Sequence, residues 1–328
     1  MRPKLTDVAE KAGCSPTTVS RVINNYGYIS QKTKDRVYAA MRELNYQPNT
    51  LARSLQGKQT KMIGVIVPSI TNPFFAELVA KIEEQLSDDG YKMILCNAEQ
   101  DSIKERQYLR MLEANQVDGI IAGSHNLDIE DYRRFGLPIV SFDRDLASSV
   151  PIVGSDNYQG GCLASQALVD AGCKHIYFIG NPNKTGNPTF YRFEGYADTM
   201  AKANLTVHTA RSAFYESPSA KVAALKELLA SERKIDGVFC SDDMTAILLL
   251  RVAKNLGIKV PEELKVVGFD GTQLIQNYEP DLATIVQPIG DLAGMLVKLL
   301  YERIADPSKP LAQNSYLLPV KLLKNQTI

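Results

Sequence analysis

From residue 61 onwards, short apolar runs alternate with amphipathic helical patterns, and this alternation constrains the fold more than any other feature. The runs that we expect to be strands are 62–67, 93–97, 119–124, 139–143, 153–156, 176–180, 207–213, 238–241 and 265–270. The helical patterns are 74–86, 104–114, 158–170, 193–202, 221–230, 246–255 and 292–305. Alternating strands and helices form parallel sheets through right-handed crossovers. Because the pattern begins again near residue 157, we expect two doubly wound parallel-sheet subdomains with a cleft between them.

The end of the chain is expected to contribute to both subdomains. We expect the helix 292–305 to return to the first half and a final strand, 316–322, to join the second half. The N-subdomain would then comprise about 61–156 plus 286–313, and the C-subdomain about 157–285 plus 314–328. At roughly 100–200 residues per domain, a chain of 328 residues has room for this core and a small module before it.

Residues 1–47 predict that module, a small all-α head. Three short helical patterns follow one another, and Gly13 supplies the positive φ that a sharp turn between the first two requires. Ser15 can cap the second helix and Pro16 fits its first position. Two helices joined by a tight turn, with a polar face on the second, predict a helix-turn-helix.

The zero net charge hides an asymmetry between the head and the rest. Residues 1–60 hold ten basic and four acidic side chains, a net charge of +6, so the other residues, with 27 basic and 33 acidic, carry −6. A basic module suits a nucleic acid, because phosphate neutralisation dominates affinity for DNA. Charge alone would equally fit a merely solvated basic surface.

The run LTDVAEKAGCSPTTVSRVIN, residues 5–24, resembles the head of the LacI/GalR bacterial repressors. The resemblance implies a partner, double-stranded operator DNA, and a core like that of periplasmic binding proteins. It places Pro16, Thr17 and Arg21 against base edges, where Arg21 can donate two hydrogen bonds to guanine. Residues assigned to phosphate contacts are Thr6, Thr18, Ser20, Asn24, Tyr26 and Asn49.

Residues 48–60 form the expected linker between head and core. Pro48 and Gly57 enclose about eight residues, and an isolated helix that short is marginal in water. The resemblance implies a hinge helix that folds on the operator and pairs with its dimer mate in the minor groove. Its minor-groove residues would be Leu51, Ala52, Arg53 and Leu55, with Leu55 wedged between base pairs.

Polar residues follow several predicted strands, where ligands bind in open α/β sheets. Carboxylates and amides beside aromatic faces suit the hydroxyls and apolar faces of a sugar. The resemblance sharpens this to the effector residues Asn72, Phe74, Asp143, Arg192, Phe214, Asp242, Asp270 and Gln287. The alternative for a strand-end Asp is a helix cap, and for a Phe at helical spacing it is the core. We favour the core for Phe75 and the pocket for Phe74.

Several classes of protein are disfavoured. No apolar run is long enough to span a membrane, and the N-terminus has no signal-peptide pattern, so we expect a cytoplasmic protein. Five scattered cysteines and three isolated histidines predict no metal site. Phosphate-binding and dinucleotide-binding glycine motifs are missing, so we expect no cofactor and no enzyme activity.

We therefore predict a DNA-binding repressor of sugar-utilisation genes, controlled by sucrose, fructose or a phosphorylated derivative. An extracytoplasmic sugar-binding protein and a sugar-modifying enzyme are the alternatives from other classes. A family-related catabolite regulator whose corepressor is a phosphoprotein is a further one. Because no leucine heptad follows the final strand, we expect a homodimer rather than a tetramer.

Overall fold

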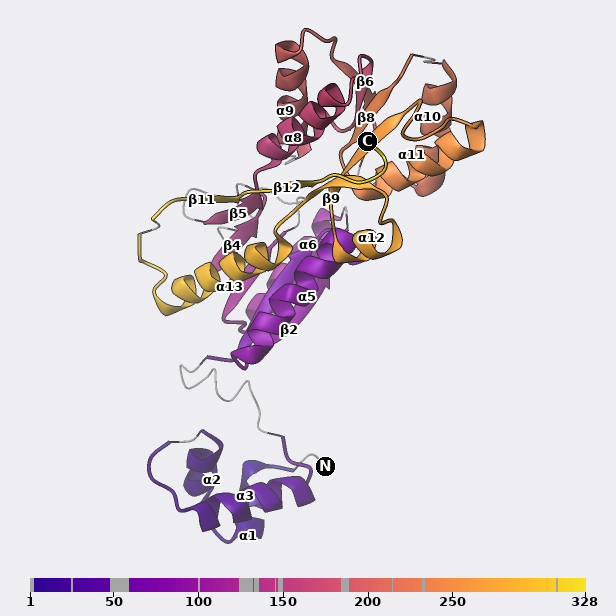
Figure 1. Ribbon diagram of the computed structural model, residues 1–328. Coiled ribbons are helices and arrows are strands. Elements are labelled where there is room, and N and C mark those ends of the chain that lie inside the picture. The colour runs from indigo at the N-terminus through magenta and orange to yellow at the C-terminus, as the bar shows by residue number, and fades with distance from the viewer. Residues whose placement is uncertain are drawn as a thin grey trace. The chain divides into compact units, whose positions relative to one another are not determined.

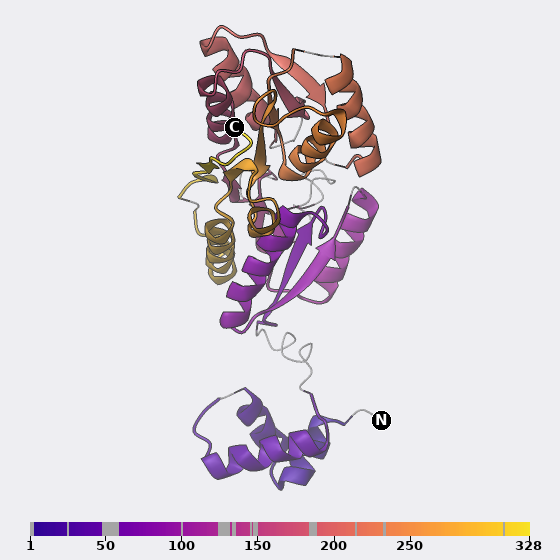
Figure 2. The ribbon, with the colours of Figure 1, turned by 45° about the vertical axis from the view of Figure 1, so that its right-hand side comes forward.

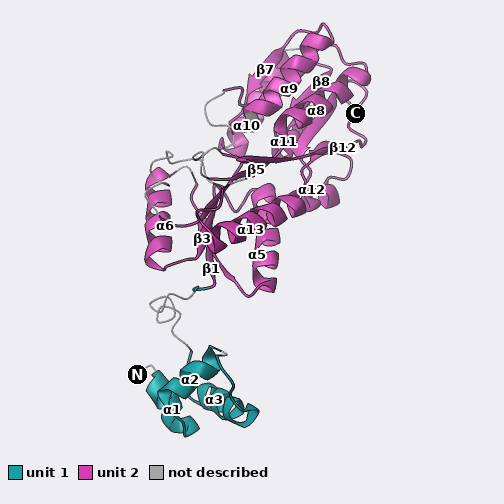
Figure 3. Cartoon of the chain, turned by 90° about the vertical axis from the view of Figure 1, so that its left-hand side faces the viewer, with its two compact units in different colours: residues 1–60 teal, residues 61–328 magenta. Residues whose placement is uncertain are grey.

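The computed structural model divides into two compact units, residues 1–60 and residues 61–328 (Figure 3). It describes residues 3–24, 26–47, 59–99, 101–123, 132, 136–144, 146, 150–183, 189–213, 215–231, 234–310 and 312–328. Among these residues, no helix is long and apolar enough to cross a membrane.

The first unit is a three-helix head. Its helices are α1 (Leu5–Ala12), α2 (Pro16–Ile23) and α3 (Gln31–Glu43). Gly13 ends α1 in the left-handed conformation, with φ of 61°, and the Ser15 hydroxyl accepts a hydrogen bond from the Thr18 amide to cap α2. Valines from all three helices are buried together, as the helical spacing predicted. The tight turn therefore sets α2 across α1 as a helix-turn-helix requires.

The second unit contains two six-stranded sheets, each covered by helices on both faces (Figures 1 and 2). The N-subdomain sheet has the order β11-β5-β4-β3-β1-β2. Its strands are β1 (Met62–Val67), β2 (Lys92–Asn97), β3 (Gly119–Ala122), β4 (Ile139–Phe142), β5 (Ile152–Ser155) and β11 (Ser315–Leu318). Its helices are α5 (Pro73–Asp88), α6 (Ser102–Ala114) and α13 (Ile289–Ala305). All its strand pairs are parallel.

Alternate residues of β1 face opposite sides of this sheet. Ile63 and Val65 pack with α5 and α13, whereas Ile66 packs with α6. The return of the last long helix to the first half, expected from the sequence, is confirmed by the packing of α13 on α5.

The C-subdomain sheet has the order β12-β10-β9-β8-β6-β7. Its strands are β6 (Ile176–Gly180), β7 (His208–Arg211), β8 (Gly237–Cys240), β9 (Lys265–Asp270), β10 (Ala283–Val286) and β12 (Lys321–Leu323). Its helices are α8 (Asn157–Asp170), α9 (Thr189–Lys202), α10 (Pro218–Ser231), α11 (Asp243–Leu256) and α12 (Gln273–Tyr278). All its pairs are parallel except β10 with β12.

Helices α8 and α9 approach each other closely, and two glycines make this possible. A Cβ atom on Gly161 would lie 2.2 Å from the Arg192 carbonyl oxygen, and one on Gly195 would lie 2.3 Å from the Tyr158 carbonyl oxygen. This contact fixes the backbone of Arg192, a predicted effector residue, against the start of α8.

The prediction of one final strand over 316–322 is wrong. The segment forms two strands, β11 in the N-subdomain sheet and β12 in the C-subdomain sheet. Pro319 lies between them and has no amide hydrogen for a ladder, which explains the interruption. The sequence analysis also missed β10 and the short α12. The chain therefore passes between the subdomains three times, after β5, after β10 and after β11.

Candidate DNA-reading helix and effector site

The outward face of α2 carries the residues predicted to contact bases. Pro16, Thr17 and Arg21 are exposed, whereas Val19 and Val22 are buried in the head. Thr17 and Arg21 are four residues apart and therefore lie on the same side of the helix. A duplex approaching this side would meet a guanidinium and a hydroxyl group, with the exposed ring of Pro16 at the start of the helix.

The residues predicted to contact phosphates differ in exposure and in the hydrogen bonds that their side chains make. Thr6 is exposed on α1, and Tyr26, after α2, is 68% exposed. The Thr18 and Ser15 hydroxyls lie 2.9 Å apart at the cap of α2. The Asn24 amide donates to the Ser20 carbonyl at 2.8 Å and to the Ser20 hydroxyl at 3.3 Å. These contacts hold the side chains close to the surface of α2.

Some predicted residues lie outside the described residues. They are the phosphate residue Asn49, the hinge residues Leu51, Ala52, Arg53 and Leu55, and the effector residue Phe214.

Arg192 is the centre of a buried polar network in the C-subdomain. It lies on α9, is 5% exposed, and donates through Nε to Asn157 Oδ1 at 2.7 Å. Its Nη1 donates to the Ser241 carbonyl at 2.5 Å and lies 3.5 Å from Asp270 Oδ1. The guanidinium carbon also lies 3.5 Å from the centre of the Phe269 ring, a cation–π contact. These contacts fix the position of the Arg192 guanidinium group. A cation that orients a ligand needs this rigidity.

The network continues from Asp270 into the N-subdomain. The Gln287 amide donates to Asp270 Oδ1 at 2.8 Å, and the Ser155 hydroxyl donates to Gln287 Oε1 at 2.7 Å. Ser155 ends β5 in the N-subdomain, and Asp270 ends β9 in the C-subdomain. The predicted residues Arg192, Asp270 and Gln287 are therefore brought together, and they connect the two sheets.

Asp143 stands at the equivalent strand end of the N-subdomain, directly after β4. Its φ is 60°, and a Cβ atom on the neighbouring Gly154 would lie 2.3 Å from its Oδ1. Glycine at 154 thus leaves the space that this carboxyl group occupies.

Burial perturbs the titration of these groups. Loss of hydration raises the pKa of Asp143 to about 7 and that of Asp270 to about 7, although the positive charge of Arg192 opposes both changes. Burial also lowers the pKa of Arg192, while the surrounding carboxylates act in the opposite direction. Perturbed groups gathered in this way are typical of a ligand site.

Three other predicted effector residues have structural contacts instead. Asn72 Oδ1 accepts hydrogen bonds from the Phe74 and Phe75 amides and so caps α5. Phe74 is buried in the core, its ring 5.6 Å from that of Phe142, so the structure places it in the core with Phe75 and not on an open wall. Asp242 caps α11 by accepting from the Thr245 amide at 2.7 Å and from its hydroxyl at 2.9 Å.

The sequence analysis did not single out several members of the network. They are Ser155, Asn157, Ser241 and Phe269. Ser155 and Phe269 lie within predicted strands, and Asn157 opens the helix after one, so strand ends examined together would have found them. Asp243, which follows the predicted residue Asp242, is buried and accepts hydrogen bonds from the Gly271 amide at 2.7 Å and the Thr284 hydroxyl at 2.5 Å. It therefore supports the turn that carries Asp270.

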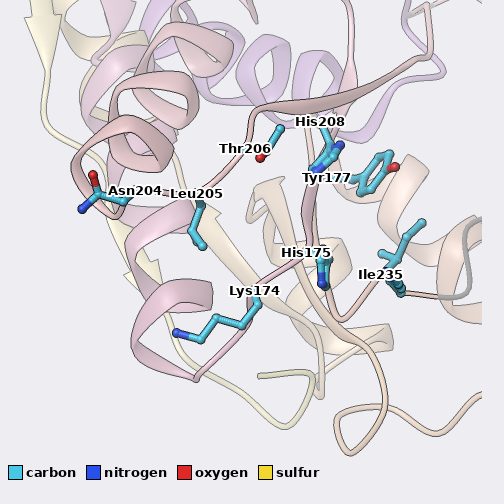
Figure 4. A pocket seen from close by; sticks show the side chains of 9 residues that line it. Lys174, His175, Tyr177, Asn204, Leu205, Thr206, His208 and Ile235 are labelled. Carbon is cyan, nitrogen blue, oxygen red and sulfur yellow. The ribbon is translucent and has the colours of Figure 1, made fainter.

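A hollow of about 510 Å³ lies at the opposite, amino end of the C-subdomain strands. Figure 4 shows His175, Tyr177 and His208 on one side of it and Asn204 and Leu205 on the other. None of the predicted effector residues lines it. Within the described part of the chain, no group of His, Cys, Asp and Glu side chains has the arrangement of a metal site.

Comparison with known proteins agrees with both units. The model of the family described as bacterial regulatory proteins, lacI family, matches residues 4–49. That described as periplasmic binding proteins and sugar binding domain of LacI family matches residues 60–325. The sucrose operon repressors of Pediococcus pentosaceus and Streptococcus mutans are 53% and 48% identical to this chain, each over 100% of both chains. A crystal structure of the Lac repressor dimer bound to operator and the anti-inducer ONPF is 27% identical, with a TM-score of 0.85, over 100% of this chain and 99% of that one.

A helix-turn-helix head and a two-subdomain sugar-binding core together define a ligand-responsive DNA-binding regulator. The chain belongs to the LacI family of bacterial regulatory proteins. This membership, and not any missing motif, identifies it as a regulator rather than an enzyme.

Proposed function

We propose that the chain represses sugar-utilisation genes by binding a near-palindromic operator as a homodimer in the cytoplasm, with affinity controlled by a sugar in the core cleft. The observation that carries this proposal is the buried network from Arg192 through Asp270 and Gln287 to Ser155. A ligand that bonds to its members would favour one arrangement of the subdomains, which is what an effector must do. The names of the relatives, sucrose operon repressors, support sucrose or a product of it.

In this proposal residues 1–47 form the head, 48–60 the hinge and 61–328 the effector-binding and dimerisation core. The α2 helices of two protomers read successive major grooves, which a symmetric dimer on a palindrome requires. Pro16, Thr17 and Arg21 contact bases, and Thr6, Thr18, Ser20, Asn24, Tyr26 and Asn49 position the backbone. The hinge residues Leu51, Ala52, Arg53 and Leu55 enter the minor groove, and the core biases their folding.

In the cleft, sugar hydroxyls exchange hydrogen bonds with Asp143, Asp270 and Gln287. Arg192 orients these side chains. Phe214 supplies an aromatic face against which the sugar packs. The contacts of Asn72, Phe74 and Asp242 support instead a role in shaping the cleft, since Asn72 Oδ1, the Phe74 ring and Asp242 Oδ1 are already engaged.

The experiment is a selection of binding sites from random duplex DNA, followed by titration of the selected duplex with sucrose and fructose. We expect a palindromic site and a change in DNA affinity of about tenfold, or roughly 1.4 kcal/mol of coupling. A duplex bound tightly but with no response to any sugar or sugar phosphate would contradict sugar control and favour a phosphoprotein corepressor. Failure to select any sequence would contradict the whole proposal.

A further inference from the structure

The hollow at the amino end of the C-subdomain strands gathers basic side chains that the proposed function does not use (Figure 4). Four of the nine residues that line it are basic, and none of these lining residues, all in the described part of the chain, is acidic. The basic ones are Lys174, His175, His208 and Lys234. Ligand sites in proteins occupy about 300–1,000 Å³, so side chains that line one hollow of about 510 Å³ can contact the same small molecule.

One side of the hollow is formed by the strand pair β6 and β7. Tyr177 lies opposite His208 in this parallel pair, and their rings stack with centroids 4.7 Å apart and planes inclined by 13°. Leu205, after α9, and Ile235, before β8, add aliphatic surface. The hollow therefore combines cations with aromatic and aliphatic surface, which is the composition that an organic anion requires.

The backbone of two of the basic residues is held by the carboxylate of Asp236. Its Oδ2 accepts from the Lys174 amide at 2.8 Å, and its Oδ1 accepts from the His175 amide at 2.8 Å. Both oxygens of this carboxylate are thus bonded to the main chain. Among the described residues, no carboxylate forms a salt bridge with the ammonium group of Lys174 or Lys234, so these two charges are left for a ligand.

A buried hydroxyl group fixes the position of His208. Tyr196 Oη donates to the Ile176 carbonyl at 2.8 Å and accepts from the His208 amide at 2.9 Å. β7 is the edge strand of its sheet, and this bridge ties its first residue to β6. Because the backbone on both sides of the hollow is anchored in this way, a ligand would order little of the protein when it binds.

We propose that this hollow binds a small organic phosphate at a second site, separate from the sugar cleft. A phosphate group carries about −1.5 to −2 charge at pH 7 and three acceptor oxygens, which match two ammonium groups and the imidazole N–H donors. Its organic part would lie against Tyr177, Leu205 and Ile235. The two ligands should not compete, because Arg192 and Asp270 meet at the carboxyl ends of the strands and the hollow lies at the amino ends.

The test is calorimetric titration of the full chain with AMP, adenosine and inorganic phosphate. We expect AMP to saturate a single site and to bind about tenfold more tightly than either other probe, because it alone has both the charge and the ring. The double variant Lys174→Gln/Lys234→Gln should weaken AMP binding about tenfold, since both ammonium groups are lost. The matched control, Lys226→Gln/Lys254→Gln, removes two exposed lysines from α10 and α11 and should leave the AMP affinity within about twofold.

Four results would overturn the proposal. AMP binding that does not saturate at millimolar concentration, or that weakens equally in both double variants, would show only the general attraction of a basic surface. Equal affinity for AMP and inorganic phosphate would show an adventitious ion only. Loss of AMP binding in Asp143→Asn, which changes the sugar cleft alone, would place AMP in that cleft. Sugar control of DNA binding would stand after each of these results, because it does not depend on the hollow.

Discussion

The strand ends of the two subdomains carry similar residues that make different contacts. At the N-subdomain strand ends, Asn72 caps α5 through its Oδ1 and Phe74 is packed in the core. On the C-subdomain side, Arg192 and Asp270 are joined to each other and through Gln287 to the first subdomain. Polar atoms at the strand ends therefore either join residues of the two sheets, as in Asp270, or cap the next helix, as in Asn72.

The largest effect is expected from breaking the network at its centre. Arg192→Met leaves buried carboxyl groups without their cation, so the unfolding free energy of the core should fall by about 3 kcal/mol and effector binding should be lost. Arg251→Met, on the exposed surface of α11, is the control and should change neither quantity. Urea unfolding followed by circular dichroism measures the first effect and calorimetry the second. Normal effector affinity in Arg192→Met would remove Arg192 from the site.

The stability of the core should also depend on pH through Asp270. The native carboxyl group keeps its proton up to pH about 7, whereas the unfolded one loses it near pH 4. The native state therefore binds more protons between these values, and the unfolding free energy must fall as pH rises from 4 to 7. Asp270→Asn should remove about 3 kcal/mol of this fall, measured as the difference between the two proteins' urea unfolding curves across that range. Identical pH profiles would contradict the assignment.

A smaller effect is expected where Asp143 is displaced without being removed. Gly154→Ala places a methyl group where Asp143 Oδ1 now lies, so the carboxyl group must turn away. Loss of one charge-assisted hydrogen bond should weaken effector binding about tenfold. At Gly123, in the same subdomain, a Cβ atom would meet its nearest neighbour at 3.4 Å, an ordinary contact. Gly123→Ala is therefore the matched control, and equal affinities in the two variants would contradict a role for Asp143.

The smallest effects are expected at the caps. Asn72→Ala and Asp242→Ala each remove a helix cap, so each should lower the unfolding free energy by about 1 kcal/mol. Effector affinity should stay within about twofold, because Asn72 Oδ1 and Asp242 Oδ1 accept from backbone amides and Asp242 Oδ2 accepts from the Thr245 hydroxyl. A tenfold loss of affinity in either variant, with little loss of stability, would make that residue a ligand contact and break the distinction between the two sides.

The sequence predicted the architecture well because hydrophobic periodicity reports directly on burial. The apolar run of β1 is an example, because Ile63 and Ile66 face helices on opposite sides of the sheet and both are buried. The prediction failed at the last strand, where Pro319 divides one apolar run between two sheets. Periodicity does not show with which sheet a segment pairs.

The sequence analysis named Arg192, Asp270 and Gln287, which the structure joins in one buried network, but not their partners. Asn157 and Ser155 became members of the network through long-range packing, including the approach of α8 to α9 that Gly161 permits. No local pattern shows such a contact. The same limit explains why the sequence analysis assigned Phe74 to the pocket. Its core neighbour Phe142 lies 68 positions further along the chain.

Coupling between the cleft and DNA is the central claim, and it is tested most directly by measuring one effector affinity twice. Fructose 6-phosphate and fructose would be titrated calorimetrically into the free protein and into the protein saturated with its selected duplex. If the sites are coupled, the effector affinity must change between the two by the same factor as the effector changes the DNA affinity, about tenfold. Equal effector affinity on and off the DNA would contradict the claim.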